Sequence, residues 1–153
     1  MKSVLIVEDD DYKLESLQEC LTQFDDIEVK VCNSFTSAAK AIKRTTFNLL
    51  LLDMSLPTFD GGGTSDEGDA QGLGGKRLIR LCSEYGTLCP TILVTQFSNY
   101  EGLGKTTTVT EMASELTGIL GERFIGTVRY NRASSDWKVS LNTYLQTALA
   151  RQH

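Results

Sequence analysis

Short apolar runs alternate with helical patterns along the chain. Residues 4–7, 47–52 and 91–94 are apolar runs with the length of strands buried on both faces of a sheet. Residues 27–31 alternate between apolar and polar, as in a more peripheral strand, and residues 124–128 supply a fifth strand. Apolar residues recur at helical spacing between and after these strands, at 14–24, 35–42, 78–82, 109–120 and 137–149. Five β/α units in series predict an α/β fold, a doubly wound parallel sheet with helices on both faces and its functional site at the carboxyl ends of the strands.

One segment interrupts this alternation. Seven of the sixteen residues from Asp60 to Gly75 are glycine, and acidic residues are mixed among them. Such a composition cannot bury enough apolar surface to order itself. We therefore expect residues 1–153 to form one domain with an inserted glycine-rich surface loop at about 58–75. Because this segment begins just beyond a strand end, a lid or docking segment is the alternative interpretation.

The charge and the reactive residues exclude several classes of function. The formal charge is −5 and the isoelectric point is near 4.9, which argues against nucleic acid as a partner. The only histidine is His153, the final residue, so a Ser/His/Asp or Cys/His relay is excluded. The four cysteines include no CxxC pair, and no segment is typical of a signal peptide or a membrane span. We expect a cytoplasmic protein with reduced thiols and no membrane partner.

Acidic residues follow two of the predicted central strands. Glu8 and Asp9 come directly after the run at 4–7, and Asp53 follows the run at 47–52. Because the carboxyl ends of neighbouring parallel strands share one edge of the sheet, these three carboxylates should converge. Clustered carboxylates repel one another unless a cation neutralises them, and an oxygen ligand set without His or Cys suits Mg²⁺. The alternative is that these acids cap the following helices and face solvent.

Three strand-end motifs follow one another along the chain. Val-Leu-Ile-Val leads into Glu8-Asp9, Leu-Leu-Leu-Leu leads into Asp53-Met-Ser-Leu-Pro57, and Ile-Leu-Val leads into Thr95. In this order the motifs resemble the response-regulator receiver domain of two-component signalling. Each motif is short, but their order and their placement at strand ends make the combination fairly specific. The resemblance implies a flavodoxin-like sheet with the strand order 2-1-3-4-5.

The resemblance also assigns roles to the strand-end residues. Asp53 would be the phosphoacceptor, taking a phosphoryl group from the phosphohistidine of a histidine kinase or a phosphotransfer protein. Asp9 and Asp53 would bind Mg²⁺ directly, Glu8 mostly through a water, and Ser55 through its backbone carbonyl. The Thr95 hydroxyl would hydrogen-bond a phosphoryl oxygen. A metal and a cation are needed because phosphoryl transfer spreads negative charge over oxygens held beside carboxylates.

The fifth strand departs from the pattern of the family. Receivers normally end this strand in Lys-Pro, and the lysine pairs with the phosphoryl group, whereas this chain has Arg129-Tyr130. Arg129 is the expected substitute, although its guanidinium is bulkier than an ammonium and favours bidentate contacts. An ordinary edge arginine is the alternative. Gly126 stands where receivers usually place the aromatic residue that moves on activation, so the threonine-aromatic coupling is expected to be missing.

These features predict a stand-alone receiver that acts as a phosphorylation-controlled switch through an unidentified output protein. It is expected not to be an enzyme beyond self-phosphorylation and slow autodephosphorylation. One alternative is a degenerate receiver that is never phosphorylated and serves as a protein-interaction module. Another is a P-loop NTPase that uses Lys105, which lies between a strand and a helix in the manner of a phosphate-binding loop. Asn99 replaces the first glycine of that motif, and Glu101 adds negative charge to it.

Overall fold

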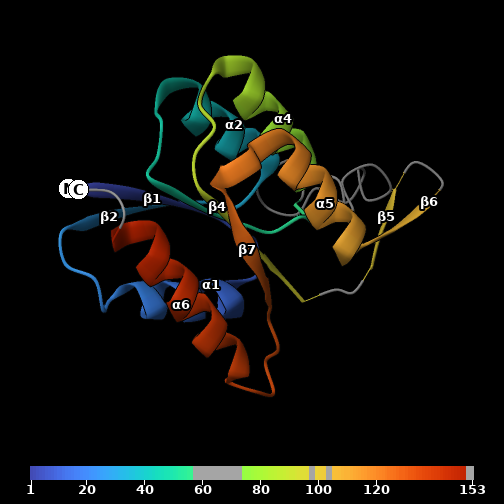
Figure 1. The fold of residues 1–153 in the computed structure, drawn as a ribbon. Helices are drawn as coiled ribbons and strands as arrows, with labels where there is room; N and C mark the ends of the chain where they lie inside the picture. The colour runs from blue at the N-terminus through green and yellow to red at the C-terminus, as the bar shows by residue number, and fades with distance from the viewer. Residues whose placement is uncertain (57–73, 97–98, 103–104, 151–153) are drawn as a thin grey trace.

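The computed structural model describes residues 1–56, 74–96 and 108–150, together with the backbone of residues 99–102 and 105–107 (Figure 1). The predictions for residues 58–73, for the Lys105 side chain and for His153 lie outside the described residues. Gly74 and Gly75, expected at the end of the glycine-rich loop, instead begin a helix.

Five strands form one parallel sheet. They are β1 (Lys2–Val7), β2 (Ile27–Cys32), β3 (Leu49–Leu52), β4 (Thr91–Thr95) and β7 (Phe124–Arg129). Their order across the sheet is β2-β1-β3-β4-β7, and every neighbouring pair is parallel. Numbered along the chain within this sheet, the order is 2-1-3-4-5, which confirms the prediction. β1 and β3 are neighbours, with Val7 opposite Leu52, so the residues after both strands meet at one edge.

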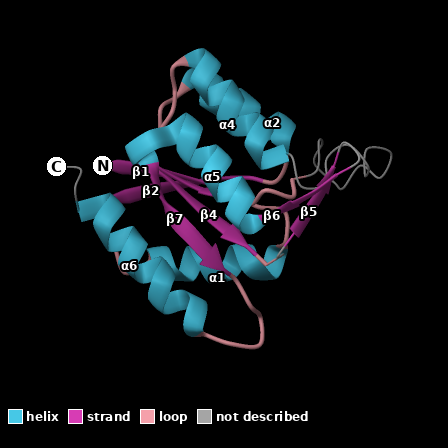
Figure 2. Ribbon diagram, turned by 45° about the vertical axis from the view of Figure 1, so that its right-hand side comes forward, coloured by secondary structure: helices cyan, strands magenta, loops and turns pink. Residues whose placement is uncertain are grey.

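Helices cover both faces of the sheet (Figure 2). One face carries α1 (Asp11–Leu21) and α6 (Asp136–Ala150), and the other carries α2 (Phe35–Arg44), α4 (Gly74–Tyr85) and α5 (Val109–Leu120). A short 3-10 turn, η2 (Gly121–Arg123), leads from α5 into β7. Successive residues of a strand point to opposite faces, so the apolar run of β1 divides between the two cores. Val4 and Ile6 pack with α1 and α6, whereas Leu5 and Val7 pack with the other three helices.

Side-chain caps fix where several helices begin. Asp10 accepts hydrogen bonds from the backbone N–H groups of Tyr12 and Lys13 at the start of α1. Ser34 forms a capping box with Ser37 at the start of α2. Each cap satisfies backbone donors that the first helical turn leaves without an intrahelical partner. Asp10 therefore aligns α1 directly behind the acids that follow β1.

A hairpin that the sequence pattern did not predict stands between β4 and α5. β5 (Asn99–Gly102) and β6 (Lys105–Thr108) pair antiparallel and lie beside the main sheet, next to the start of α5 (Figures 1 and 2). A phosphate-binding loop would place its lysine at the first turn of a helix, where backbone N–H groups point at the anion. Lys105 instead lies on β6, four positions before α5 begins. The backbone therefore disfavours the P-loop hypothesis.

Two further observations concern cysteines and membrane spans. The four cysteines are buried and form no disulfide within the described part of the chain. No helix among the described residues is both long and apolar enough to cross a bilayer.

Candidate active site at the carboxyl edge of the sheet

The three predicted acids converge at the carboxyl edge of the sheet. One carboxylate oxygen from each of Glu8, Asp9 and Asp53 lies within 4.8 Å of the others. The Asp53 N–H donates to the carbonyl of Val7, and the Glu8 N–H donates to the carbonyl of Cys32, so strand pairing continues into both acidic segments. The backbone of the sheet therefore holds these acids together. Glu8 and Asp53 are buried, while Asp9 is exposed at the mouth of the cluster.

Burial and mutual repulsion make these carboxyl groups harder to ionise. Burial, followed by the charge of Asp53, raises the pKa of Glu8 to about 7. The same two causes raise the pKa of Asp9. Burial also raises the pKa of Asp53, against the opposing effects of the Lys13 ammonium and the Ser55 N–H. A cation at this position is therefore favoured, because it stabilises the ionised form of each acid.

Lys13 supplies a cation inside this cluster. Its Nζ lies 2.6 Å from Oε1 of Glu8 and 3.7 Å from Oδ1 of Asp53, and it donates a hydrogen bond of 2.8 Å to the Val94 carbonyl. These contacts join the ends of β1, β3 and β4 through one ammonium group. The sequence analysis did not identify Lys13 as a site residue.

A signal for Lys13 was present in the helical pattern. The buried residues of α1 are Lys13, Leu17, Cys20 and Leu21, which are spaced four, seven and eight positions from the first. This is the spacing of one helix face, so a lysine stands in line with the apolar stripe. Leu14, which the sequence analysis placed on that stripe, is only half-buried. The signal for a role of Lys13 in the site was therefore a charged residue on the apolar helix face, one turn after the acid pair.

Ser55 and the start of α4 complete the segment around Asp53. The Ser55 N–H donates to Asp53 Oδ1 over 3.2 Å. Gly75 approaches this segment so closely that a Cβ there would lie 2.9 Å from the Asp53 carbonyl oxygen and 2.7 Å from the sulfur of Met54. The Gly75 N–H also donates to the Met54 carbonyl. The glycine at this position therefore allows α4 to pack directly against the backbone that carries Asp53.

Thr95 ends β4 beside the acidic cluster. Its side chain is buried, and its backbone carbonyl accepts a hydrogen bond of 2.8 Å from the Tyr130 N–H. Val94, the residue before it, gives its carbonyl to Lys13. The end of β4 is thus bound to α1 on one side and to the end of β7 on the other.

Comparison with known proteins agrees with this geometry. Residues 4–67 match the model of the response regulator receiver domain. The Detocs response regulatory protein DtcB of Enterobacter cloacae is 29% identical over 141 residues, which cover 90% of this chain and 94% of that protein. The chain is similar to response-regulator receiver domains in sequence and in fold. An uncharacterized protein of Sinorhizobium fredii, y4jR, is 24% identical to this chain over 143 residues, 90% of this chain and 92% of that protein.

Solved structures show the same fold. A CheY-like receiver domain protein from Methanospirillum hungatei superposes on this chain with a TM-score of 0.64 at 18% identity, covering 99% of this chain and 97% of that one. The receiver domain of the sensor histidine kinase PA1611 from Pseudomonas aeruginosa superposes with a TM-score of 0.59 at 18% identity, covering 97% and 98%. That structure holds a magnesium ion coordinated in its active-site cleft.

The sequence analysis expected Arg129 to be the cation beside Asp53. Arg129 ends β7 and its side chain is exposed, whereas Lys13 of α1 forms an ion pair with Asp53. The role of Arg129 toward a phosphoryl group stays a prediction.

Gly126 is covered by an aromatic ring from another element. A Cβ at Gly126 would lie 2.5 Å from Cζ of Tyr144, a residue of α6. The ring of Tyr144 thus occupies the space that a side chain at position 126 would need, and it packs onto β7 from α6.

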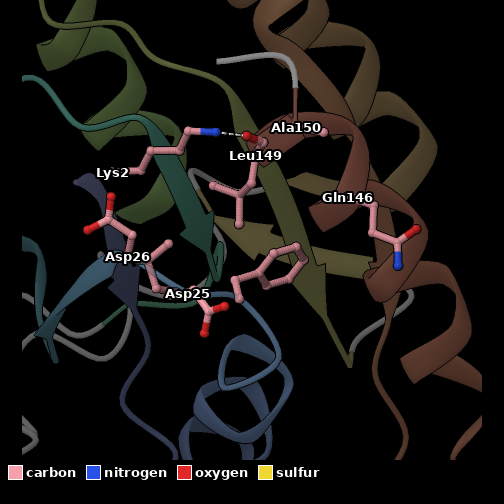
Figure 3. Close-up of a pocket in the computed structure, with 8 residues that line it drawn as sticks. Lys2, Asp25, Asp26, Gln146, Leu149 and Ala150 are labelled. Atoms are coloured by element: carbon pink, nitrogen blue, oxygen red, sulfur yellow. Dashed lines mark hydrogen bonds between the residues drawn. The ribbon is translucent and has the colours of Figure 1, made fainter. Parts of the chain in front are cut away.

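The structure also has a depression of about 300 Å³ at the opposite edge of the sheet. Lys2, Asp25, Asp26 and Gln146 contribute to its lining, and Lys2 donates to the carbonyl of Leu149 (Figure 3). None of its lining residues belongs to the acidic cluster. The carboxyl edge is therefore the candidate active site.

Proposed function

We propose that this receiver accepts a phosphoryl group on Asp53 in a Mg²⁺-dependent reaction and signals the change to a protein partner. The observation that carries the proposal is the convergence of Glu8, Asp9 and Asp53 around a buried ammonium group. The family match supports the same reading, since the motif positions for the acid pair and the phosphoacceptor fall within residues 4–67.

Asp53 is suited to act as the nucleophile. It follows a buried central strand, and its carboxylate is 5% exposed, so few competing waters surround it. The Ser55 N–H fixes the orientation of one carboxylate oxygen. In the proposed reaction, an Asp53 oxygen forms a bond to phosphorus while the bond from phosphorus to the donor nitrogen or oxygen breaks. The departing group, imidazole or a carboxylate, leaves with that electron pair.

The acids of this receiver fit a divalent cation. Glu8, Asp9 and Asp53 supply only oxygen ligands, which are the ligands that Mg²⁺ prefers, and the Ser55 carbonyl is the further ligand implied by the family. When bound, Mg²⁺ supplies positive charge that neutralises the phosphoryl oxygens. The exposure of Asp9 leaves an open approach to the cluster for the hydrated ion.

The partner side of the proposal rests on Thr95 and on the family. Thr95 is buried at the end of β4, the strand that pairs with β3, and its hydroxyl would bind an oxygen of a phosphoryl group on Asp53. A histidine kinase or a phosphotransfer protein would supply the phosphoryl group, and an output protein would read the altered surface. The relative from Enterobacter cloacae bears the name of a response regulatory protein, which is consistent with such a role.

The decisive experiment is phosphorylation by a small donor. The full chain would be incubated with acetyl phosphate and Mg²⁺, and the intact mass would be followed over time. We expect the addition of one phosphoryl group in the wild type and in Asp11→Asn, a matched control at an exposed acid outside the cluster. We expect none in Asp53→Asn or after chelation of Mg²⁺. An unmodified wild type would reject the proposal in favour of a degenerate, protein-binding receiver.

A further inference from the structure

Lys13 is a buried charge in an apolar helix face. Its side chain is 1% exposed, and it shares the inward face of α1 with Leu17 and Leu21. Lysine is seldom fully buried, and when it is, its ammonium group must be paired. The Lys13 ammonium has three such partners: the Glu8 carboxylate at 2.6 Å, the Asp53 carboxylate at 3.7 Å and the Val94 carbonyl at 2.8 Å.

Packing alone does not explain a lysine at this position. A buried ion pair is often no more stabilising than apolar side chains that replace both of its members, so stability alone does not account for a charged pair here. What an ammonium adds is positive charge directed at Glu8 and Asp53. The ring of Tyr130, whose centroid is 5.9 Å from Nζ, closes the site on the side of β7 and favours a cation.

The distance between Lys13 and Asp53 also suits a residue that binds a phosphoryl group carried by Asp53. Nζ makes its close ion pair with Glu8 and stands 3.7 Å from Asp53 Oδ1, beyond ordinary hydrogen-bond length. Asp53 therefore has an ammonium beside it and is not locked into a short ion pair. A phosphoryl oxygen attached to Asp53 would extend toward the same charge.

We propose that Lys13 is the cation that binds the phosphoryl group on Asp53, in place of the lysine that receivers carry at the end of the fifth strand. This inference rests on the proposed function of Asp53. The charge reaches the site from α1 rather than from β7, so phosphorylation pulls on α1 and on the Val94 carbonyl.

The step balances without transfer of a proton to or from Lys13. With acetyl phosphate, an Asp53 oxygen forms the new bond to phosphorus, the bond from phosphorus to the acetyl oxygen breaks, and acetate leaves with its electron pair. The ammonium remains protonated throughout and acts only by charge and hydrogen bonding to a phosphoryl oxygen. Later hydrolysis consumes one water, releases inorganic phosphate and restores the Asp53 carboxylate.

The first test compares lysine variants in the acetyl phosphate assay. Lys13→Met keeps the length of the side chain and removes its charge, and Lys76→Met is the matched control, since Lys76 also forms an ion pair, 3.0 Å from Glu115, away from the acidic cluster. We expect Lys13→Met to slow phosphorylation of Asp53 by roughly a hundredfold, and Lys76→Met to change it by less than about twofold. A restored rate in the double variant Lys13→Met/Arg129→Lys would support the inference, because it would show that a lysine at the end of β7 can replace the charge of Lys13.

A second measurement does not depend on the stability of a variant. The ¹⁵Nζ resonances of the lysines in the wild-type protein would be recorded with Mg²⁺, before and after beryllofluoride, and Lys13 would be assigned by its loss in Lys13→Arg. We expect the Lys13 resonance to shift when beryllofluoride binds. A constant Lys13 resonance beside shifted amides of Asp53 and Thr95 would overturn the inference.

The outcomes separate this inference from the proposed function. A wild type that takes up no phosphoryl group rejects both. A wild type that is phosphorylated, with a folded Lys13→Met variant modified at the same rate, rejects the role of Lys13 alone and leaves Asp53 as the acceptor.

Discussion

Two basic residues stand near the carboxyl edge of the sheet, one on α1 and one at the end of β7. Lys13 is buried and contacts Glu8, Asp53 and the Val94 carbonyl, whereas the Arg129 side chain is exposed. Both are cations, but Lys13 lies within the buried cluster, whereas Arg129 lies at the surface. An exposed ion is screened by water and salt, while a buried one is screened far less.

The difference teaches that a site function need not stay on one element of a fold. The carboxyl edge collects the ends of β1, β3, β4 and β7, so several elements can deliver a charge to the same point. In this chain α1 begins immediately behind the acid pair, and its third residue, Lys13, is buried. The end of β7 then need not supply that charge. Tyr130, the residue after β7, is buried against Trp137 with ring centroids 4.9 Å apart.

The largest effect is expected from removing the Lys13 charge. Lys13→Met leaves Glu8, Asp9 and Asp53 clustered without their cation, and breaking a buried ion pair in this way costs about 3–5 kcal/mol of unfolding free energy. Urea denaturation of the metal-free protein would measure the loss. Because Mg²⁺ replaces part of the missing charge, the destabilisation should shrink when millimolar Mg²⁺ is added.

Asp53→Asn provides the matching control for this experiment. It removes one negative charge from the cluster, so the metal-free protein should become more stable, the opposite sign to Lys13→Met. Equal destabilisation by the two substitutions would show that shape, rather than charge, governs the stability of this edge.

The next effect concerns pH. The pKa of Glu8 is raised by burial from 4.5 to about 7, so between these values the folded protein holds a proton that the unfolded chain has lost. The unfolding free energy of the metal-free protein should therefore fall as pH rises from about 4.5 to 7, by up to roughly 3 kcal/mol from this group. Glu8→Gln should flatten the dependence, and Asp11→Asn should not. Stability that rises over this range would contradict the described electrostatics.

A smaller effect is expected at Gly126. In Gly126→Ala the new methyl group would lie 2.5 Å from the ring of Tyr144, so the ring must shift, at a cost of about 1–3 kcal/mol. Tyr144→Ala removes the clash along with the packing of the ring. The two substitutions together should therefore be less destabilising than the sum of the single variants, measured in a double-mutant cycle. Additive losses would mean that the ring does not occupy the position of the missing side chain.

The sequence allowed the sheet and the acids to be predicted, because both follow from local pattern. The apolar runs before Glu8 and Asp53 can only be strands buried on both faces, and parallel topology then brings their ends together. The hairpin of β5 and β6 was not predicted, since the residues from Asn99 to Thr108 include few apolar positions that could show a period of two. Its pairing is set by backbone hydrogen bonds that leave little mark on the sequence.

Lys13, the cation that pairs with Asp53 in the structure, was missed for a different reason. A lysine on a helix is usually solvated, and an arginine at a strand end in the expected register is the obvious substitute for a missing lysine. Which one reaches Asp53 depends on the direction of each side chain from its own element. That direction follows from how α1 packs under the sheet. The spacing of Leu17 and Leu21 indicates the direction of Lys13 only when Lys13 is counted as part of the same buried helix face.

The smallest effect is expected from Arg129, and it is the sharpest test of the comparison. Because its side chain is exposed, Arg129→Ala should change the unfolding free energy by less than about 0.5 kcal/mol. If Lys13 supplies the charge at Asp53, the rate of phosphorylation by acetyl phosphate should also change by less than about threefold, and raising the salt concentration should reduce even that difference. Arg132→Ala is the matched control, since Arg132 is also exposed and lies over the ring of Tyr12, 4.1 Å from its centroid. A loss of phosphorylation in Arg129→Ala as deep as in Lys13→Met would return the role to the strand end, and it would mean that the exposed guanidinium moves inward when the phosphoryl group arrives.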